Sequence, residues 1–137
     1  MFRFVLLFSL LVLSLKADMI MSPDALPKNT REFISSNFKA PISLVQVDGS
    51  TYEVYLSDGS EFEFDISGNF KEVKSKFTPI PPSILPANIA TIITHEYPNA
   101  HIVKIERKIL YYEIKLSNQL ELKIDTNGTV LSREFDD

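Results

Sequence analysis

The stretch YEVYLSDGSEFEFDISG, residues 52–68, is nearly repeated sixty positions later as YEIKLSNQLELKIDTNG, residues 112–128. In both copies apolar and polar residues alternate, and a short turn sequence interrupts the alternation once. A period of two with one apolar and one polar face is typical of half-buried antiparallel strands. Each copy therefore predicts two strands joined by a hairpin. The residues predicted to face inward are Tyr52, Val54, Leu56, Phe62, Phe64, Ile66, Tyr112, Ile114, Leu116, Leu120, Leu122 and Ile124.

An amphipathic helix is predicted ahead of each copy, within residues 26–38 and 85–97. Each segment opens with Leu-Pro and spaces the residues of one face at i, i+3, i+4 and i+8, which is a single helical stripe. Proline in the first turn suits a helix start. All four glycines of the chain fall at predicted hairpin turns. Further strands are predicted at residues 42–47, 70–74, 101–107 and 129–135.

These elements predict an α+β fold of two tandem units, each a helix plus a four-stranded antiparallel meander, with the helices covering one sheet face. The two repeats span residues 26–74 and 85–135, and a proline-rich linker at 75–84 joins them within one domain, residues 18–137. One unit of roughly fifty residues would bury too little surface to be stable alone. We therefore expect the two meanders to join or pack into one continuous sheet whose polar face stays bare.

The first residues predict a cleavable signal peptide, residues 1–17. A positive start at Arg3 precedes an apolar run over 4–15, and the small Ala17 marks the predicted cut. The apolar run is shorter than the roughly 20 residues that a membrane-spanning helix needs. The sequence therefore predicts a periplasmic or secreted protein with no stable membrane anchor after cleavage.

Composition narrows the classes of partner and cofactor. The 137 residues include 14 basic and 18 acidic ones, which gives a net charge of −4. Removal of the predicted signal peptide takes away Arg3 and Lys16, and the net charge becomes −6. A chain of this sign lacks the basic field that holds phosphates, which argues against nucleic acid as a partner. It contains no cysteine and two histidines. We therefore expect no disulfide, no zinc site and no cofactor.

Catalytic motifs are absent from the sequence, so we expect a protein that is not an enzyme. There is no cysteine nucleophile, no Gly-x-Ser-x-Gly elbow and no glycine-rich phosphate loop. Glu61 and Glu63 could form a glycosidase-like carboxylate pair, but they are same-face neighbours on one predicted strand, with no predicted cleft.

The order of motifs resembles that of the PepSY-like family, also described as β-lactamase-inhibitor-like proteins. Each unit reads Leu-Pro, a short helix ending in Phe or Tyr, Tyr-Glu-[Val/Ile]-x-Leu, a turn, a strand ending in Asp, and x-x-Gly, over residues 26–135. The resemblance implies a small exported protein of tandem helix-plus-sheet units that binds or inhibits other proteins. The β-lactamase inhibitor of similar fold has disulfides and binds through an aspartate and an aromatic on hairpin loops. This chain has no cysteine, and Asp48 is the nearest residue in kind.

Candidate partner-binding residues lie on the predicted polar face. Tyr55 and Tyr111 are amphipathic aromatics of the type that anchors interfaces, although cross-strand packing alone would also account for them. Glu53 and Glu63 belong to an acidic set that could bind a basic partner or calcium, or could simply be solvated strand positions. Asn127, in Asn-Gly-Thr, is a possible glycosylation site, and Asn-Gly is also a favoured turn pair.

The function predicted from these features is an exported, periplasmic protein-binding or inhibitor-like module that is non-catalytic and uses its open sheet face. Its expected partner is an exported protein or peptide of unknown identity. The alternative is an envelope protein that binds a small ligand or an ion. A flat aromatic surface would favour the first, and a pocket with converging oxygen atoms would favour the second.

Overall fold

The computed structural model describes residues 19–135, so the predicted signal peptide and its cleavage site lie outside the described residues. Within this range, no helix is long and apolar enough to cross a membrane. The elements are β1 (Met19–Ile20), the 3₁₀ turn η1 (Pro23–Ala25), α2 (Lys28–Asn37), β2 (Ile42–Asp48), β3 (Thr51–Leu56), β4 (Glu61–Asp65), β5 (Phe70–Lys74), the 3₁₀ turn η2 (Pro82–Ile84), α3 (Ala87–Glu96), β6 (Ile102–Arg107), β7 (Tyr111–Leu116), β8 (Leu120–Asp125) and β9 (Val130–Phe135).

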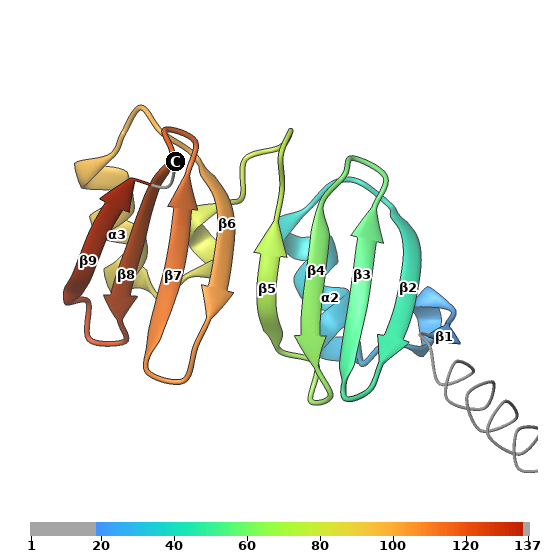
Figure 1. Cartoon of the computed structure of the whole chain (residues 1–137). Helices are drawn as coiled ribbons and strands as arrows, with labels where there is room; N and C mark the ends of the chain where they lie inside the picture. The colour runs from blue at the N-terminus through green and yellow to red at the C-terminus, as the bar shows by residue number, and fades with distance from the viewer. Residues whose placement is uncertain (1–18, 136–137) are drawn as a thin grey trace, which may run out of the picture.

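The strands form one antiparallel sheet whose spatial order, β1 to β9, is also their order in the chain (Figure 1). The predicted fold class, two tandem units of one helix and four strands, is therefore wrong. The protein is mostly a single nine-stranded sheet with two α-helices among residues 19–135. The two predicted units form one sheet because β5 pairs directly with β6. At this seam Val73 of β5 lies opposite Ile105 of β6. Without this pairing, β5 and β6 would each leave an edge of unpaired backbone N–H and C=O groups.

Strand β1 is the strand that the sequence did not predict, and the two 3₁₀ turns were not predicted either. The two residues of β1, Met19 and Ile20, pair with Val47 and Gln46 of β2. This pairing brings the number of strands in the sheet from the predicted eight to nine. The proposed division into repeats 26–74 and 85–135 with a linker at 75–84 concerns the origin of the sheet rather than its pairing, and it stays a prediction.

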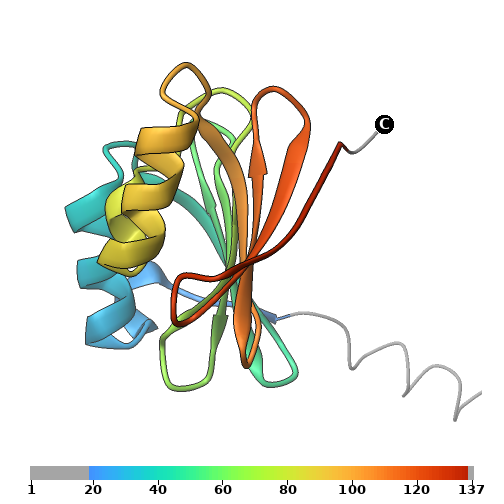
Figure 2. The ribbon, with the colours of Figure 1, turned by 90° about the vertical axis from the view of Figure 1, so that its left-hand side faces the viewer.

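Both α-helices lie on the same face of the sheet, and within residues 19–135 the opposite face carries no helix (Figure 2). The core fills the space between them. Phe64, Ile105 and Ile114 are fully buried there, and Phe33 of α2 stacks on Phe70 with ring centroids 5.3 Å apart. Of the residues predicted to face inward, Ile66 is the exception, with 58% of its surface exposed. It lies past the end of β4, where the chain has already turned.

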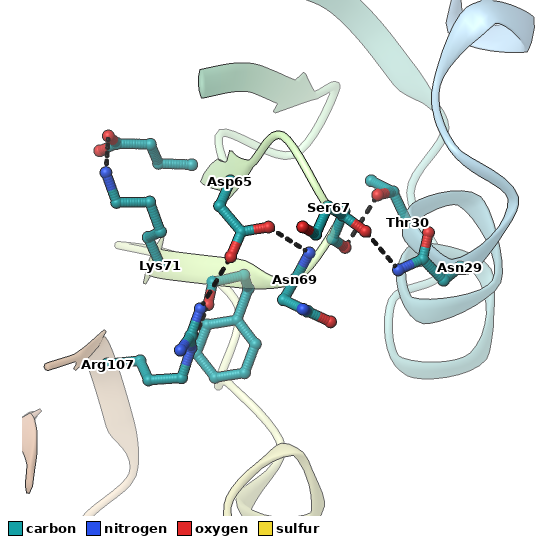
Figure 3. A network of polar contacts seen from close by, with 10 residues as sticks. Asn29, Thr30, Asp65, Ser67, Asn69, Lys71 and Arg107 are labelled. Carbon is teal, nitrogen blue, oxygen red and sulfur yellow. Dashed lines mark hydrogen bonds and ion pairs between the residues drawn. The ribbon is translucent and has the colours of Figure 1, made fainter. Parts of the chain in front are cut away.

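The turn that exposes Ile66 also anchors helix α2 (Figure 3). Thr30, which is fully buried, donates a hydrogen bond from its hydroxyl to the carbonyl oxygen of Gly68 at 2.9 Å. Asn29 donates from its amide to the carbonyl oxygen of Ser67 at 2.9 Å. At the other helix, Asn88 of α3 makes a similar bond to Thr126 in the turn before β9, at 3.3 Å. Each helix is thus tied to a hairpin turn by polar residues of its first turn.

Arg107 closes the seam where the β5–β6 ladder stops. The two strands pair over only three positions. Beyond them Arg107 donates from Nε to the carbonyl oxygen of Phe70 at 2.7 Å, and its guanidinium contacts the Asp65 carboxylate at 3.2 Å (Figure 3). The side chain therefore makes the connection between β5 and β6 that the backbone does not make at this end.

Candidate functional site

The sheet face opposite the helices, called here the open face, is built from the polar positions of the strands. Since side chains alternate along a strand, the residues between buried positions project from this face. In β3, for example, Val54 is fully buried while its neighbours Glu53 and Tyr55 are half-buried on the other side. The charged side chains of this face include a row of five glutamates and a cluster of four lysines.

Five glutamates lie directly opposite one another on five consecutive strands and form what we call the glutamate row. The pairings are Glu53 with Glu63, Glu63 with Glu72, Glu72 with Glu106 and Glu106 with Glu113. Like charges placed opposite each other destabilise a sheet. At a strand spacing of about 4.8 Å the row is roughly 19 Å long.

Each glutamate of the row contacts at least one neighbouring side chain that stabilises its negative charge. Glu106 has the closest contacts, with the ammonium groups of Lys104 and Lys108 both at 2.8 Å. The other contacts are longer or uncharged: Glu72 with Lys74 at 3.5 Å and Lys104 at 3.6 Å, Glu63 with Lys71 at 3.5 Å, Glu113 with Lys123 at 3.7 Å, and Glu53 with the Tyr55 hydroxyl at 3.2 Å.

These contacts shift the acid–base equilibria at the centre of the row. The hydrogen bond from Lys104, with a second from Lys108, holds the pKa of Glu106 below its ordinary value. The same hydrogen bond to Glu106 raises the pKa of Lys104. Because both groups favour their charged forms in the fold, the pair stabilises the protein between the two ordinary pKa values, roughly 4.3 and 10.4.

Replacing Glu106 with glutamine is expected to lower the free energy of unfolding by about 0.5–1 kcal/mol at pH 7. The pKa of Glu106 is lowered in the folded state, so its contribution is present above the unfolded pKa and is lost as the pH falls through the folded pKa. The difference between the wild type and Glu106→Gln should therefore shrink below about pH 4. Urea unfolding at pH 7 and pH 3 measures it. Glu32 of α2, which forms an exposed ion pair with Lys28 at 3.8 Å, supplies the control Glu32→Gln. An equal, pH-independent loss in both variants would contradict the assignment.

At one end of the open face, the lysine groove is defined by Lys74, Lys76, Lys104 and Lys115. Lys74 lies opposite Lys104, and Lys104 lies opposite Lys115, on β5, β6 and β7. The groove has a volume of about 580 Å³, and Glu61 is the single acid among its lining residues. It runs between the turn after β3 and the turn after β7.

One wall of the lysine groove is held by a polar network on the turn after β3. Asp58 accepts hydrogen bonds from the backbone N–H of Ser60 at 2.9 Å and from the Thr78 hydroxyl at 3.1 Å. Burial pushes the pKa of Asp58 up, but these hydrogen bonds outweigh it and hold the pKa below its ordinary value. The buried Ser75 hydroxyl in turn accepts from the Thr78 backbone N–H at 3.2 Å. The network ties the segment after β5 to this turn.

The structure brings some of the predicted site residues together and separates others. Tyr55, Glu53 and Glu63 are neighbours on β3 and β4, with Tyr55 donating to Glu53. Tyr111 also lies in the sheet, with its ring 6.0 Å from the Lys123 ammonium, but on β7. Four strand spacings, roughly 19 Å, separate it from the strand of Tyr55.

The two remaining predicted residues lie in turns. Asp48 ends β2 at the exposed turn into β3, where its carbonyl oxygen accepts from the Thr51 hydroxyl at 2.9 Å. Asn127 is exposed in the turn between β8 and β9, where its backbone N–H is bonded to Asp125. Its glycosylation stays a prediction.

Sequence analysis missed the two charge clusters as clusters. Glu72 and Glu106 are far apart in the chain, as are Lys74 and Lys115, and they become neighbours only through the β5–β6 seam. The sequence shows that charged residues occupy alternate positions of these strands. It does not show which strands pair with one another. Among residues 19–135, no three His, Cys, Asp or Glu side chains converge in a way that could hold a metal ion.

Residues 50–132 match the sequence profile of a family described as "Putative beta-lactamase-inhibitor-like, PepSY-like". Three solved structures from Bacteroides are also similar to the chain. One, from Bacteroides thetaiotaomicron, is described as a "putative calcium-regulated periplasmic protein"; it is 34% identical, with a TM-score of 0.80, over 85% of this chain and 96% of that one. No curated protein matches the chain.

The other two similar structures are from Bacteroides vulgatus and are both described as periplasmic. The first is 30% identical, with a TM-score of 0.80, and covers 85% of this chain and 96% of its own. The second, described as of unknown function, is 29% identical, with a TM-score of 0.78, and covers 86% of this chain and 99% of its own. The identity and coverage together indicate common ancestry over nearly the whole described chain.

Proposed function

Because the chain belongs to the PepSY-like, β-lactamase-inhibitor-like family, we propose that it is a non-catalytic periplasmic module that binds another exported protein or a peptide through its open face. The observation that carries the proposal is the placement of both helices on one side of the sheet (Figure 2). The other side is left as a broad surface of half-exposed charged and aromatic residues.

The size of the open face suits a protein partner. The eight longer strands, β2 to β9, are spaced by about 4.8 Å and are about six residues long at about 3.3 Å per residue, so they span roughly 34 Å by 20 Å. This area is close to the roughly 800 Å² that each partner contributes to a standard protein interface. Tyr55, with its ring on this face and its hydroxyl bonded to Glu53, has the amphipathic character common at interface anchors.

We also propose that the chain reaches the periplasm through cleavage after Ala17. The three similar Bacteroides structures are described as periplasmic proteins, which supports this compartment. N-terminal sequencing of the protein recovered from a periplasmic fraction checks the cut, and a retained Met1 would contradict it.

Replacing Tyr55 and Tyr111 with alanine together is expected to reduce partner capture at least tenfold, about 1.4 kcal/mol. The reason is that truncating an aromatic anchor removes apolar contact area that the partner covers. The measurement is cross-linking in intact cells followed by mass spectrometry, which requires no assumption about the partner's identity.

The matched control for the tyrosine variant is Ile109→Ala, which removes an exposed apolar side chain from the turn after β6 instead of from the open face. It should leave capture unchanged. Equal cross-linking yields from the wild type and from a correctly folded Tyr55→Ala, Tyr111→Ala variant would count decisively against the proposal.

The alternative function is ion binding. The similar Bacteroides thetaiotaomicron protein is described as calcium-regulated, and the glutamate row supplies the carboxylate oxygens that calcium prefers. In this chain, however, those carboxylates are spread over five strands and most of them contact lysines. Calcium would have to displace these lysines. A rise in melting temperature with calcium that is abolished in Glu72→Gln would favour this alternative.

A further inference from the structure

We propose that the partner presents an acidic segment, an extended stretch or loop with several Asp or Glu side chains, and that this segment docks in the lysine groove. The inference rests on the proposed function and specifies the chemistry of the partner and the end of the open face that it occupies.

The charge of the groove is the first argument. Four lysines and a single glutamate line it, although the chain as a whole has a net charge of −4. Lys74, Lys104 and Lys115 lie opposite one another at the centre of a row that ends in Glu61, opposite Lys74, and Glu121, opposite Lys115. Like charges in the three central positions destabilise the sheet. Glu72 lies 3.5 Å from Lys74 and 3.6 Å from Lys104, and Glu106 lies 2.8 Å from Lys104, so two carboxylates already contact two of these ammonium groups. Carboxylates from a ligand would relieve the remaining repulsion.

The shape and lining of the groove are the second argument. Its volume of about 580 Å³ lies in the range of ligand-binding clefts. The half-buried Val103 supplies apolar surface, and the half-buried Ser117 supplies a hydroxyl group near the lysines, while Leu116 and Ser75 are buried beneath them. About half of the Lys74 side chain and about a third of the Lys104 side chain remain exposed. Since an ammonium group has three donors, Lys74 can bond a ligand carboxylate in addition to Glu72, and Lys104 can do so in addition to Glu72 and Glu106.

A strained residue at the rim of the groove is the third argument. Gln119 has a φ of +71° and is the one non-glycine residue with positive φ among residues 19–135. The turn after β3 has glycine, Gly59, with a φ of +90°. A side chain in this conformation costs about 1 kcal/mol, and such strain tends to persist at functional positions. Both residues line the groove, and the Gln119 amide provides donors that Gly59 lacks.

The test uses a fluorescein-labelled peptide of six glutamates with blocked ends as the probe, and fluorescence anisotropy at low salt as the readout. The wild type is expected to bind the hexaglutamate peptide more tightly than the corresponding hexalysine peptide, with an affinity that weakens as salt is raised. The double variant Lys76→Glu, Lys115→Glu is expected to lose at least tenfold in affinity. It spares Lys74 and Lys104, whose contacts with the glutamate row stabilise the sheet.

A matched control changes the same number of charges on the helix side. Lys28 and Lys39 are exposed there, and Lys28→Glu, Lys39→Glu should leave hexaglutamate affinity within about twofold of the wild type. Circular dichroism confirms folding of each variant. No hexaglutamate binding at low salt, or an equal loss in both double variants, would overturn the inference.

Gln119→Gly separates binding from stability. Because glycine relieves the strain at positive φ, the variant should be at least as stable as the wild type, yet it removes the side-chain amide and should bind hexaglutamate more weakly, by about threefold. Unchanged affinity in this variant would overturn the assignment of the Gln119 side chain to the binding site.

The cellular partner distinguishes this inference from the proposed function. If Lys76→Glu, Lys115→Glu keeps the cross-linked partner while the tyrosine variant loses it, the acidic-segment inference is wrong and the open-face proposal stands. If both variants keep the partner, both are wrong. If the lysine double variant loses the partner and the helix-side control retains it, the inference is supported.

Discussion

Replacing Gly68 with alanine is expected to lower the free energy of unfolding by about 3 kcal/mol, because two costs combine. Gly68 has a φ of +90°, which an alanine adopts only with strain. An added Cβ would also lie 2.7 Å from the Thr30 hydroxyl oxygen and would collide with the Asn29 amide. Those two side chains tie helix α2 to this turn, so relieving the collision would disrupt their hydrogen bonds to Ser67 and Gly68.

Gly49→Ala is the matched control for Gly68→Ala. Its φ is also positive, at +60°, but no atom lies within 4 Å of the position where its Cβ would be. Only the backbone cost remains, so we expect a loss of about 1 kcal/mol. Urea unfolding followed by far-ultraviolet circular dichroism measures both. Similar losses at the two positions would show that the contact between α2 and the turn does not contribute as described.

Truncating Ile105 to alanine is expected to destabilise the protein by about 3 kcal/mol while leaving a single unfolding transition. Ile105 and the opposing Val73 are fully buried at the β5–β6 seam, and they lie at the middle of its three paired positions. A cavity at this position weakens the packing between β5 and β6, which joins the strands on either side into one sheet. Since the sheet and the core continue across the seam, both sides should unfold together.

The measurement for Ile105→Ala is urea unfolding followed by nuclear magnetic resonance signals from both sides of the seam. Phe64 reports on β4 and Ile114 on β7, and both are fully buried. Coincident midpoints are the expected outcome. Persistence of the Phe64 signal after loss of the Ile114 signal would mean that the two sides are independent units. Ile109→Ala, at a side chain that is 95% exposed, should change stability by less than about 0.5 kcal/mol.

The strand positions were predictable because their signal is local. Alternation of apolar and polar residues places Val54, Phe64 and Ile114 in the core whatever the strands pair with. The same signal failed at Ile66, since the chain turns after Asp65, where the backbone N–H of Gly68 bonds to the Asp65 carbonyl oxygen at 2.9 Å. In the sequence the apolar and polar residues alternate through Ile66, whereas strand β4 ends at Asp65.

The candidate site was predictable only in its parts. Tyr55, Glu53 and Glu63 were identified as polar-face residues, and the structure makes them neighbours. The resemblance to the PepSY-like family is confirmed by the match over residues 50–132. The glutamate row and the lysine groove were not predicted, because each is assembled across the β5–β6 seam from residues far apart in the chain.

The sequence by itself determined the helical and extended segments, the face that each strand residue occupies, and the family, because periodicity and short motifs act over a few neighbouring residues. Only the tertiary structure decided that β5 pairs with β6, that Arg107 closes the gap beside them, and that the glutamate row and the lysine groove lie side by side on one face. Pairing between distant strands follows from satisfying their backbone edges and burying Val73 against Ile105, which is a property of the whole folded chain.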